Sequence, residues 1–192
     1  MAVKTFTTNE VLTASDTNTY LANSGLVYVT SATATSGSYL DILSCFSATY
    51  TNYLVLIDNA VASATLGVQI ALTTGSTPTL NAANWVWGQA RPDYAASTFS
   101  YTKEINSSYG NQVCVATTST PSSGKCELFR PNKTTYTDAL SHGQDGRGST
   151  GYMPLLTSGT LQNSTAYTGL RVAFTGGTIT SLSVTVFGYR TA

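Results

Sequence analysis

From Leu26 onward the sequence is dominated by short segments in which apolar residues recur at every second position, separated by Gly, Ser and Asn turns. Such alternation predicts strands with one buried face. The clearest segments are 66–73, 170–174 and 182–186. The segment 53–58 is apolar nearly throughout and is expected to be a strand covered on both faces. About eight to eleven short strands of this kind predict an all-β fold, a single jelly-roll-like β-sandwich over residues 26–192.

Residues 1–25 form an N-terminal segment of different character. Thr13 is expected to cap a short helix over residues 14–23, and Gly25 falls just beyond its end. A helix of about ten residues is not stable alone in water, so we expect it to pack against a partner or against the domain. The apolar residues expected to anchor this segment are Phe6, Val11, Leu12, Tyr20 and Leu21.

The chain carries very little charge. Only 9% of its 192 residues are charged, against about 25% in typical soluble domains, and nine basic residues balance nine acidic ones. Because phosphate contacts need clustered Lys and Arg, no nucleic-acid partner is expected. A free monomer normally keeps a net charge and guards its strand edges with charged side chains. We therefore expect much of the surface to contact other copies of the chain in a homo-oligomer.

The sequence indicates no targeting or membrane-spanning segment. The first ten residues, MAVKTFTTNE, lack the apolar core of a signal peptide. No apolar stretch approaches the roughly 20 residues of a membrane span. The expectation is synthesis in a cytoplasm, without membrane insertion.

Three cysteines, Cys45, Cys114 and Cys126, are an odd number and suggest no disulfide framework. Cys114 and Cys126 lie on either side of a predicted turn at 120–124, so the two thiols could face each other across a hairpin. The favoured interpretation is that the cysteines are buried and reduced, as is usual in a cytoplasm.

The single histidine, His142, lies in a Gly-rich segment with Asp138, Asp145, Arg147 and Ser149. A catalytic triad needs groups brought together by the fold, and one histidine offers no set of metal ligands. This segment is expected to be a solvent loop, with contact to a neighbouring subunit or a surface ligand as the alternative for His142, Asp145 and Arg147. The acidic residues are scattered singly, so no enzyme, cofactor or metal is predicted.

Aromatic residues are concentrated between positions 85 and 109: Trp85, Trp87, Tyr94, Phe99, Tyr101 and Tyr109. Trp85 and Trp87 are expected to share one face of a strand. Exposed rings can stack on sugars, because a ring offers a flat apolar surface with a polar edge. Buried rings pack in the core or at a subunit interface, which is the simpler interpretation.

The opening TFTTNEVLTASDTNTYL (residues 5–21) resembles the start of many tailed-bacteriophage virion proteins, in which an F-x-x-x-E/Q-V-L-T-A segment precedes a short N-x-Y/W helix. The segments ANSGLVYV (22–29) and FSATYTNYLV (46–55) resemble structural proteins of aquatic phages. The ending, from NSTAYTGL to SLSVTVFGYR (163–190), does so as well. The resemblance covers both ends and part of the middle of the chain.

This resemblance implies a virion component, a small β-domain multimer, often a trimer, fixed to the particle by its N-terminus. It carries no catalytic residues over to this chain. The leading hypothesis is a non-enzymatic minor tail or short-fibre subunit that contacts itself and other virion proteins. A capsid cement or head-decoration protein, and a module that binds a host surface glycan, are the alternatives.

Overall fold

The computed structural model describes residues 7–8, 10–11, 13–16, 25–75, 79–80, 84–93, 97–146 and 153–190. This part of the chain is all-β, as the alternation predicts. The strands are β1 (Leu26–Ala34), β2 (Tyr39–Ile42), β3 (Asn52–Ala62), β4 (Leu66–Thr74), β5 (Thr79–Leu80), β6 (Trp85–Asp93), β7 (Thr98–Ser107), β8 (Gly110–Ala116), β9 (Ser122–Phe129), β10 (Thr137–Asp145), β11 (Met153–Leu161), β12 (Gly169–Phe174) and β13 (Ile179–Tyr189).

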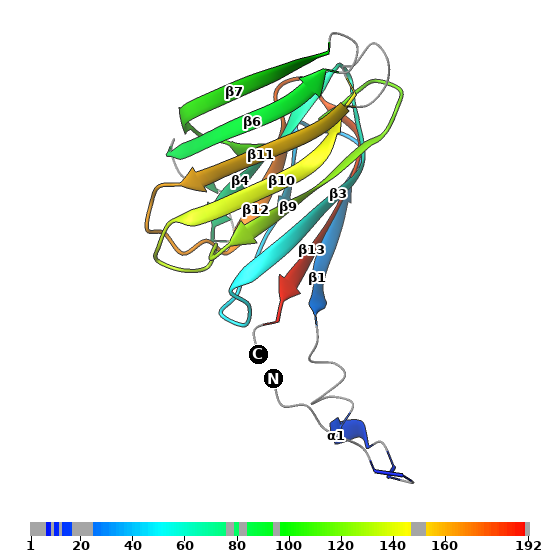
Figure 1. Cartoon of the computed structure of the whole chain (residues 1–192), viewed down its shortest axis with the longest axis vertical. Helices are drawn as coiled ribbons and strands as arrows, with labels where there is room; N and C mark the ends of the chain where they lie inside the picture. The colour runs from blue at the N-terminus through cyan, green and yellow to red at the C-terminus, as the bar shows by residue number, and fades with distance from the viewer. Residues whose placement is uncertain are drawn as a thin grey trace.

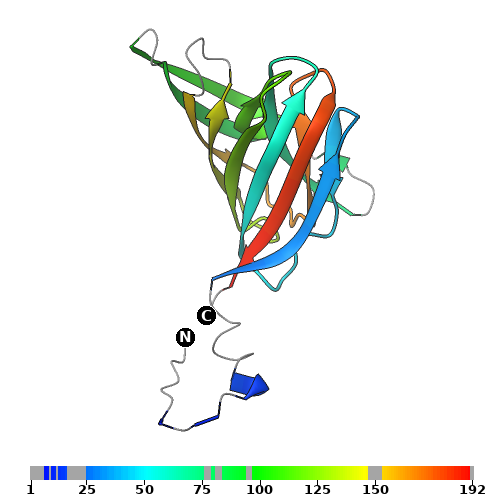
Figure 2. The ribbon, with the colours of Figure 1, turned by 90° about the vertical axis from the view of Figure 1, so that its right-hand side faces the viewer.

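These thirteen strands of the described residues form one strongly curved sheet. Its main path runs β1-β13-β3-β9-β10-β8-β4-β12-β2; β11, β6 and β7 continue from β10, and β5 pairs with β4. Figures 1 and 2 show a broad layer that extends from β7 through β6, β11, β10, β9, β3 and β13 to β1, with β4 and β12 behind it. The two ends of the path, β1 and β2, are joined by residues 35–38, so the sheet is nearly closed like a barrel.

β10 connects the broad layer to the strands behind it. It pairs antiparallel with β9 and β11 along its length, and parallel with β8 at its end, where Asp145 lies opposite Val115. The core is formed by the inward side chains of the strands around this junction. Tyr53, Leu128 and Leu170 are fully buried within it. Burying a large apolar side chain contributes roughly 1.5–3 kcal/mol, so this core is the main source of stability.

Several predicted strands are confirmed. The segments 66–73, 170–174 and 182–186 lie within β4, β12 and β13. The expectation that 53–58 is covered on both faces holds at Leu54, which is buried, but is wrong for the later part of the strand, where the outer face of β3 is uncovered. Leu56 is 36% exposed there, and Asp58 is exposed beside it.

The N-terminal segment is described only in part. Its helical residues are a single turn, α1 (Ala14–Asp16), and residues 17–24 lie outside the described ranges. Four of the anchoring candidates, Phe6, Leu12, Tyr20 and Leu21, also lie outside them. The fifth, Val11, is 77% exposed.

Candidate functional site

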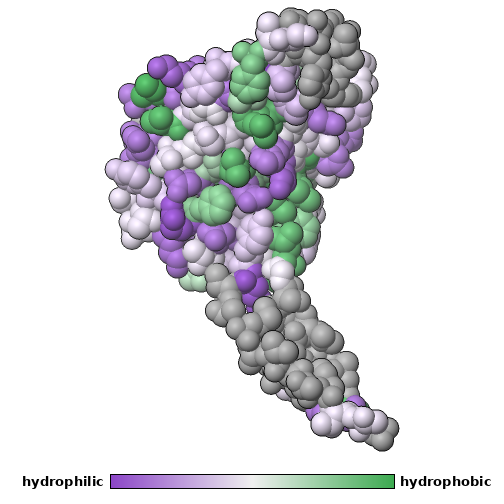
Figure 3. All heavy atoms as spheres, in the orientation of Figure 1, coloured by the Kyte–Doolittle hydropathy of each residue, from purple (hydrophilic) through white to green (hydrophobic). Residues whose placement is uncertain are grey.

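The outer face of the broad layer brings together side chains from strands that are far apart in the sequence. His142 of β10 lies opposite Leu156 of β11, Leu156 lies opposite Ala90 of β6, and Ala90 lies opposite Tyr101 of β7. Opposite residues in antiparallel strands point to the same face, so these four side chains form a row across the sheet. Figure 3 shows apolar groups interspersed with polar ones over this face.

Two adjoining depressions lie on this face over β10, β11, β6 and β7, with volumes of about 480 Å³ and about 340 Å³. Gly88, Tyr101, Leu140 and Ser158 line both of them. We call the combined depression the outer hollow. Its size falls within the range of small-molecule binding sites.

Tyr101 lies across the middle of the outer hollow, over Gly88. A Cβ atom at Gly88 would come within 2.5 Å of Tyr101 Oη and 3.1 Å of Cζ, so only glycine leaves room for the ring in this position. The Tyr101 side chain is nonetheless 67% exposed. Tyr101 is therefore an aromatic platform that rests on the sheet and is open to solvent.

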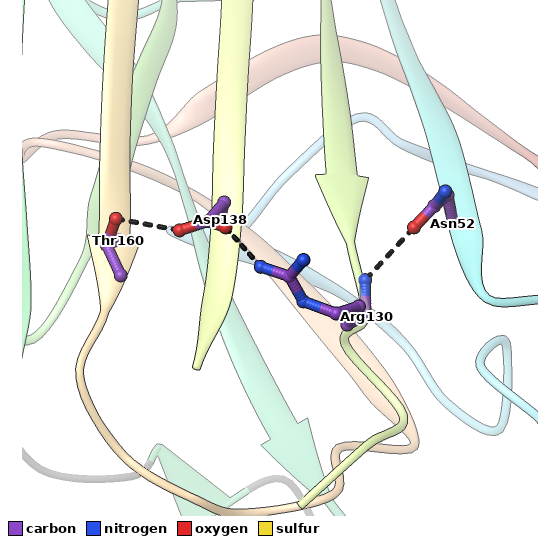
Figure 4. A network of polar contacts seen from close by, with 4 residues as sticks. All are labelled: Asn52, Arg130, Asp138 and Thr160. Atoms are coloured by element: carbon purple, nitrogen blue, oxygen red, sulfur yellow. Dashed lines mark hydrogen bonds and ion pairs between the residues drawn. The ribbon is translucent and has the colours of Figure 1, made fainter. Parts of the chain in front are cut away.

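A polar network lies at one end of the outer hollow. Thr160 Oγ1 donates a hydrogen bond of 2.8 Å to Asp138 Oδ1, and the Arg130 guanidinium pairs with the other oxygen of the same carboxylate (Figure 4). The backbone N–H of Arg130 donates to Asn52 Oδ1 at 3.3 Å. Asp138 and Thr160 both line the hollow. Because Asp138 and Arg130 are each almost half exposed, their ion pair contributes little to stability, and its main effect is to orient the carboxylate.

The two tryptophans do not provide an exposed stacking surface. Trp85 and Trp87 share one face of β6, but that face points inward, and they are 2% and 6% exposed. The Trp85 ring occupies the space above Gly110. Trp87 belongs to the lining of the outer hollow, but its side chain points to the inner face of the sheet. Phe99, like Tyr101, is 67% exposed. Tyr94 lies outside the described residues.

The interpretation of the segment around His142 as a solvent loop is wrong for its first part, because β10 continues to Asp145. His142 is exposed on the outer face of that strand and lines the hollow. Asp145 is fully buried and pairs with Arg91 at 2.9 Å. The strand therefore points His142 and Asp145 to opposite faces of the sheet. Arg147 lies outside the described ranges.

The described cysteines are free and buried. This agrees with the favoured interpretation of buried, reduced thiols. The other possibility, a hairpin that brings Cys114 opposite Cys126, is wrong, because β8 pairs with β4 and β10, whereas β9 pairs with β3 and β10. Burial raises the pKa of each thiol, Cys45, Cys114 and Cys126, to about 12. These thiols are therefore protonated and unreactive in the folded protein at neutral pH.

Within the described residues, no three His, Cys, Asp or Glu side chains gather into a set that could bind a metal ion. The helical residues that the structure describes include no segment long and apolar enough to span a membrane.

No known protein family, curated protein or solved structure matches the chain. The sequence singled out Tyr101 and His142, which the sheet brings to one hollow, but it missed Gly88, Leu140 and Thr160. The alternation within 137–145 and 153–161 could have placed Leu140 and Thr160 on the outward face. Nothing in the local pattern could have placed them beside Tyr101.

Proposed function

We propose that the protein is a non-enzymatic structural component that works as an assembly of identical copies joined along β7. The observation that carries this proposal is the exposure of that strand. β7 pairs with β6 alone, so the peptide groups along its other side have no strand partner among the described residues. All of its ten residues except Ser100 and Ser107 are exposed.

An open edge of this kind is unusual in a monomer. Edge strands with unpaired N–H and C=O groups are templates for pairing, and free proteins shorten, bend or charge them. β7 is long and carries large apolar side chains, with Phe99 67% exposed and Ile105 61% exposed. Its only charged residues are Lys103 and Glu104, whose charges cancel. A strand of another copy would satisfy the free peptide groups and place its own side chains beside these.

The geometry is compatible with a ring of copies. β1, at the opposite end of the broad layer, pairs with β13 alone among the strands that the structure describes, so β7 of one copy has an edge to meet on the next. Head-to-tail contacts of this kind close into rings when the rotation fits. A trimer remains our proposal for the number of copies.

The assembly is tested by charging the edge strand. Ile105→Lys should retain the fold, because the side chain is already exposed, but it should lower the mass in sedimentation toward the 20.2 kDa of one chain. Tyr136→Lys is the matched control, because Tyr136 is 52% exposed and lies outside the strands. If both variants keep the same mass as the unmodified protein, the copies do not associate through β7.

We further propose that the assembly is part of a bacteriophage virion, as a minor tail or short-fibre subunit, with capsid decoration as the alternative. The sequence resemblance supports this proposal, and so does the position of the two strand ends. Leu26 lies opposite Tyr189, and the Arg190 N–H donates to the Gly25 carbonyl at 3.2 Å, so residues 1–24 connect to the domain beside the end of β13 (Figure 2). A segment attached at one end of a β-domain is suited to anchoring it.

Removal of residues 1–24 should leave a folded assembly that no longer joins particles. Normal incorporation of the truncated chain would contradict the anchoring role. Labelling the protein on intact particles distinguishes the tail from the capsid.

For the fold itself, we propose that the barrel-like sheet is a jelly-roll-like sandwich. This is supported by the narrow junction between β10 and β8, which consists of a single residue pair. We also propose that the helix begun by α1 continues over residues 14–23.

A further inference from the structure

We propose that the outer hollow binds an uncharged saccharide, with Tyr101 stacking on the sugar ring and Asp138, Thr160 and Ser158 binding its hydroxyl groups. This inference goes beyond the structural function, because it holds wherever the assembly is located.

The first step is the aromatic platform. A pyranose has an apolar face of C–H groups and a rim of hydroxyls, and it stacks on a ring that is flat and accessible. Tyr101 meets both conditions, because its ring lies over Gly88 and 67% of the side chain is exposed. Leu140 and Leu156 flank it on the sheet and are 39% and 44% exposed, which extends the apolar floor.

The second step is the set of hydrogen-bonding groups around that floor. The Asp138 carboxylate has about four acceptor positions, and the Thr160 hydroxyl and Arg130 use part of them. Its remaining acceptors are available to sugar hydroxyls, since the Asp138 side chain is 44% exposed at the hollow. The hydroxyls of Ser158 and Thr160 can each both donate and accept. Carboxylate and hydroxyl groups beside an aromatic platform complement the amphipathic surface of a sugar.

The third step is the charge of the lining. Lys103 lies opposite Gly88 and shares the outward face of the sheet with Tyr101, whereas Glu104 lies opposite Trp87 and points to the other face. Asp138 is balanced by Arg130. The described lining therefore presents one outward lysine, which can donate hydrogen bonds to sugar hydroxyls, and no cluster of cations. A phosphate or a strongly acidic sugar would need such a cluster to offset the loss of its hydration, whereas an uncharged sugar would not.

The fourth step is access. Pairing along the β7 edge would extend the sheet sideways and leave its outer face open. Assembly through β7 is therefore compatible with a ligand in the hollow, and each copy would carry one such site.

The test begins with a glycan array that spans neutral and acidic glycans, probed with the labelled full-length protein. The neutral glycan with the strongest signal is then titrated by calorimetry and by amide NMR. We expect chemical-shift changes at Gly88, Leu140 and Ser158, and about a tenfold loss of affinity in Tyr101→Ala. Thr160→Val should also weaken binding, because it removes a hydroxyl from the lining and the hydrogen bond that orients the Asp138 carboxylate.

The control variant is Tyr136→Ala, which removes a similarly exposed tyrosine that does not line the hollow and should bind as the unmodified protein does. Thermal unfolding shows whether Tyr101→Ala is folded, and Gly88→Ser, which displaces the ring without deleting it, provides a second variant. The inference is overturned if no neutral glycan binds, if only acidic glycans bind, or if Tyr101→Ala and Gly88→Ser both bind normally. It is also overturned if the hollow resonances respond to protein concentration alone, since a second copy then covers the hollow.

The mass of each sample is measured in parallel. Sugar binding by a protein that is monomeric would contradict assembly through β7 and leave this inference intact. Assembly without sugar binding would contradict this inference and leave assembly through β7 intact.

Discussion

The substitution Gly143→Ala tests how closely β10 lies over β8. A Cβ atom at Gly143 would overlap the carbonyl oxygen of Val113 and come within 2.9 Å of its carbonyl carbon. Gly124 in the neighbouring strand β9 is similarly placed, with its Cβ position 2.8 Å from the same oxygen. Because the obstructing atoms belong to the backbone, no side-chain rotation can make room, and the strands themselves must separate.

The expected loss follows from the overlap. Overpacking costs about 1–3 kcal/mol, and a backbone obstacle places Gly143→Ala at the upper end. Alanine also lowers the conformational entropy of the unfolded chain, which offsets about 0.4–1 kcal/mol of this destabilisation. The net destabilisation is about 2 kcal/mol, which lowers Tm by roughly 4–8 °C for a chain of this size.

Gly67→Ala is the matched control, because it adds the same methyl group within a strand of the same sheet. Its Cβ would meet the end of the Gln112 side chain at 2.9 Å and a methyl of Thr175 at 3.1 Å, and both side chains can shift. Its cost should stay within about 1 kcal/mol. The stability of both variants is measured by urea unfolding, with tryptophan fluorescence as the signal. Equal midpoints for the two would refute the close crossing of β10 over β8, and with it the near closure of the sheet.

Two further predictions concern buried ionisable groups. Asp145→Asn removes the charge from a fully buried carboxylate paired with Arg91, and it should lower the free energy of unfolding in urea by about 2–4 kcal/mol. Asp138→Asn changes an exposed pair and should lower it by less than about 1 kcal/mol. Equal losses of stability in the two variants would contradict this prediction. Burial raises the pKa of Cys45, Cys114 and Cys126 to about 12, whereas the pKa of a thiol in the unfolded chain is about 8.5. The contribution of these thiols to stability should therefore be complete below about pH 8.5 and be lost between about pH 8.5 and about 12. This loss should appear as a urea midpoint that falls at alkaline pH. Rapid reaction of the folded protein with a thiol reagent at pH 8 would show that these thiols are not buried.

The sequence was a good guide to the strands and a poor guide to which face each one exposes. Alternation identified β4, β12 and β13, because their inward and outward residues differ in polarity. In β3 the outward residue Leu56 is as apolar as its inward neighbours, so the strand gave the same signal as one covered on both faces. Trp85 and Trp87 were correctly expected on one face, but alternation alone does not say whether that face is inward.

Gly143 explains the error around His142. In the sequence, glycines after a polar run indicate a loop, and Gly143 fits that pattern. Its actual role is to let β10 approach the backbone of β8, a requirement that arises only from tertiary packing.

The candidate site could be predicted only residue by residue. Tyr101 and Ser158 meet because β11 pairs with β6, although these strands are about 70 residues apart in the sequence. Strand pairing over such separations is set by the whole sheet and leaves no local pattern. The sequence therefore indicates which single residues can bind a ligand, but it does not indicate which of them lie together in the folded protein.

Amide hydrogen exchange along β7 in the native protein tests the central claim most directly. In an edge strand, alternate N–H groups point away from the sheet and exchange freely unless another strand binds them. Assembly along β7 predicts protection of consecutive amides across 98–107, lost on dilution and in Ile105→Lys. Protection of every second amide alone, at all concentrations, would show that the edge is open and would contradict the proposed assembly.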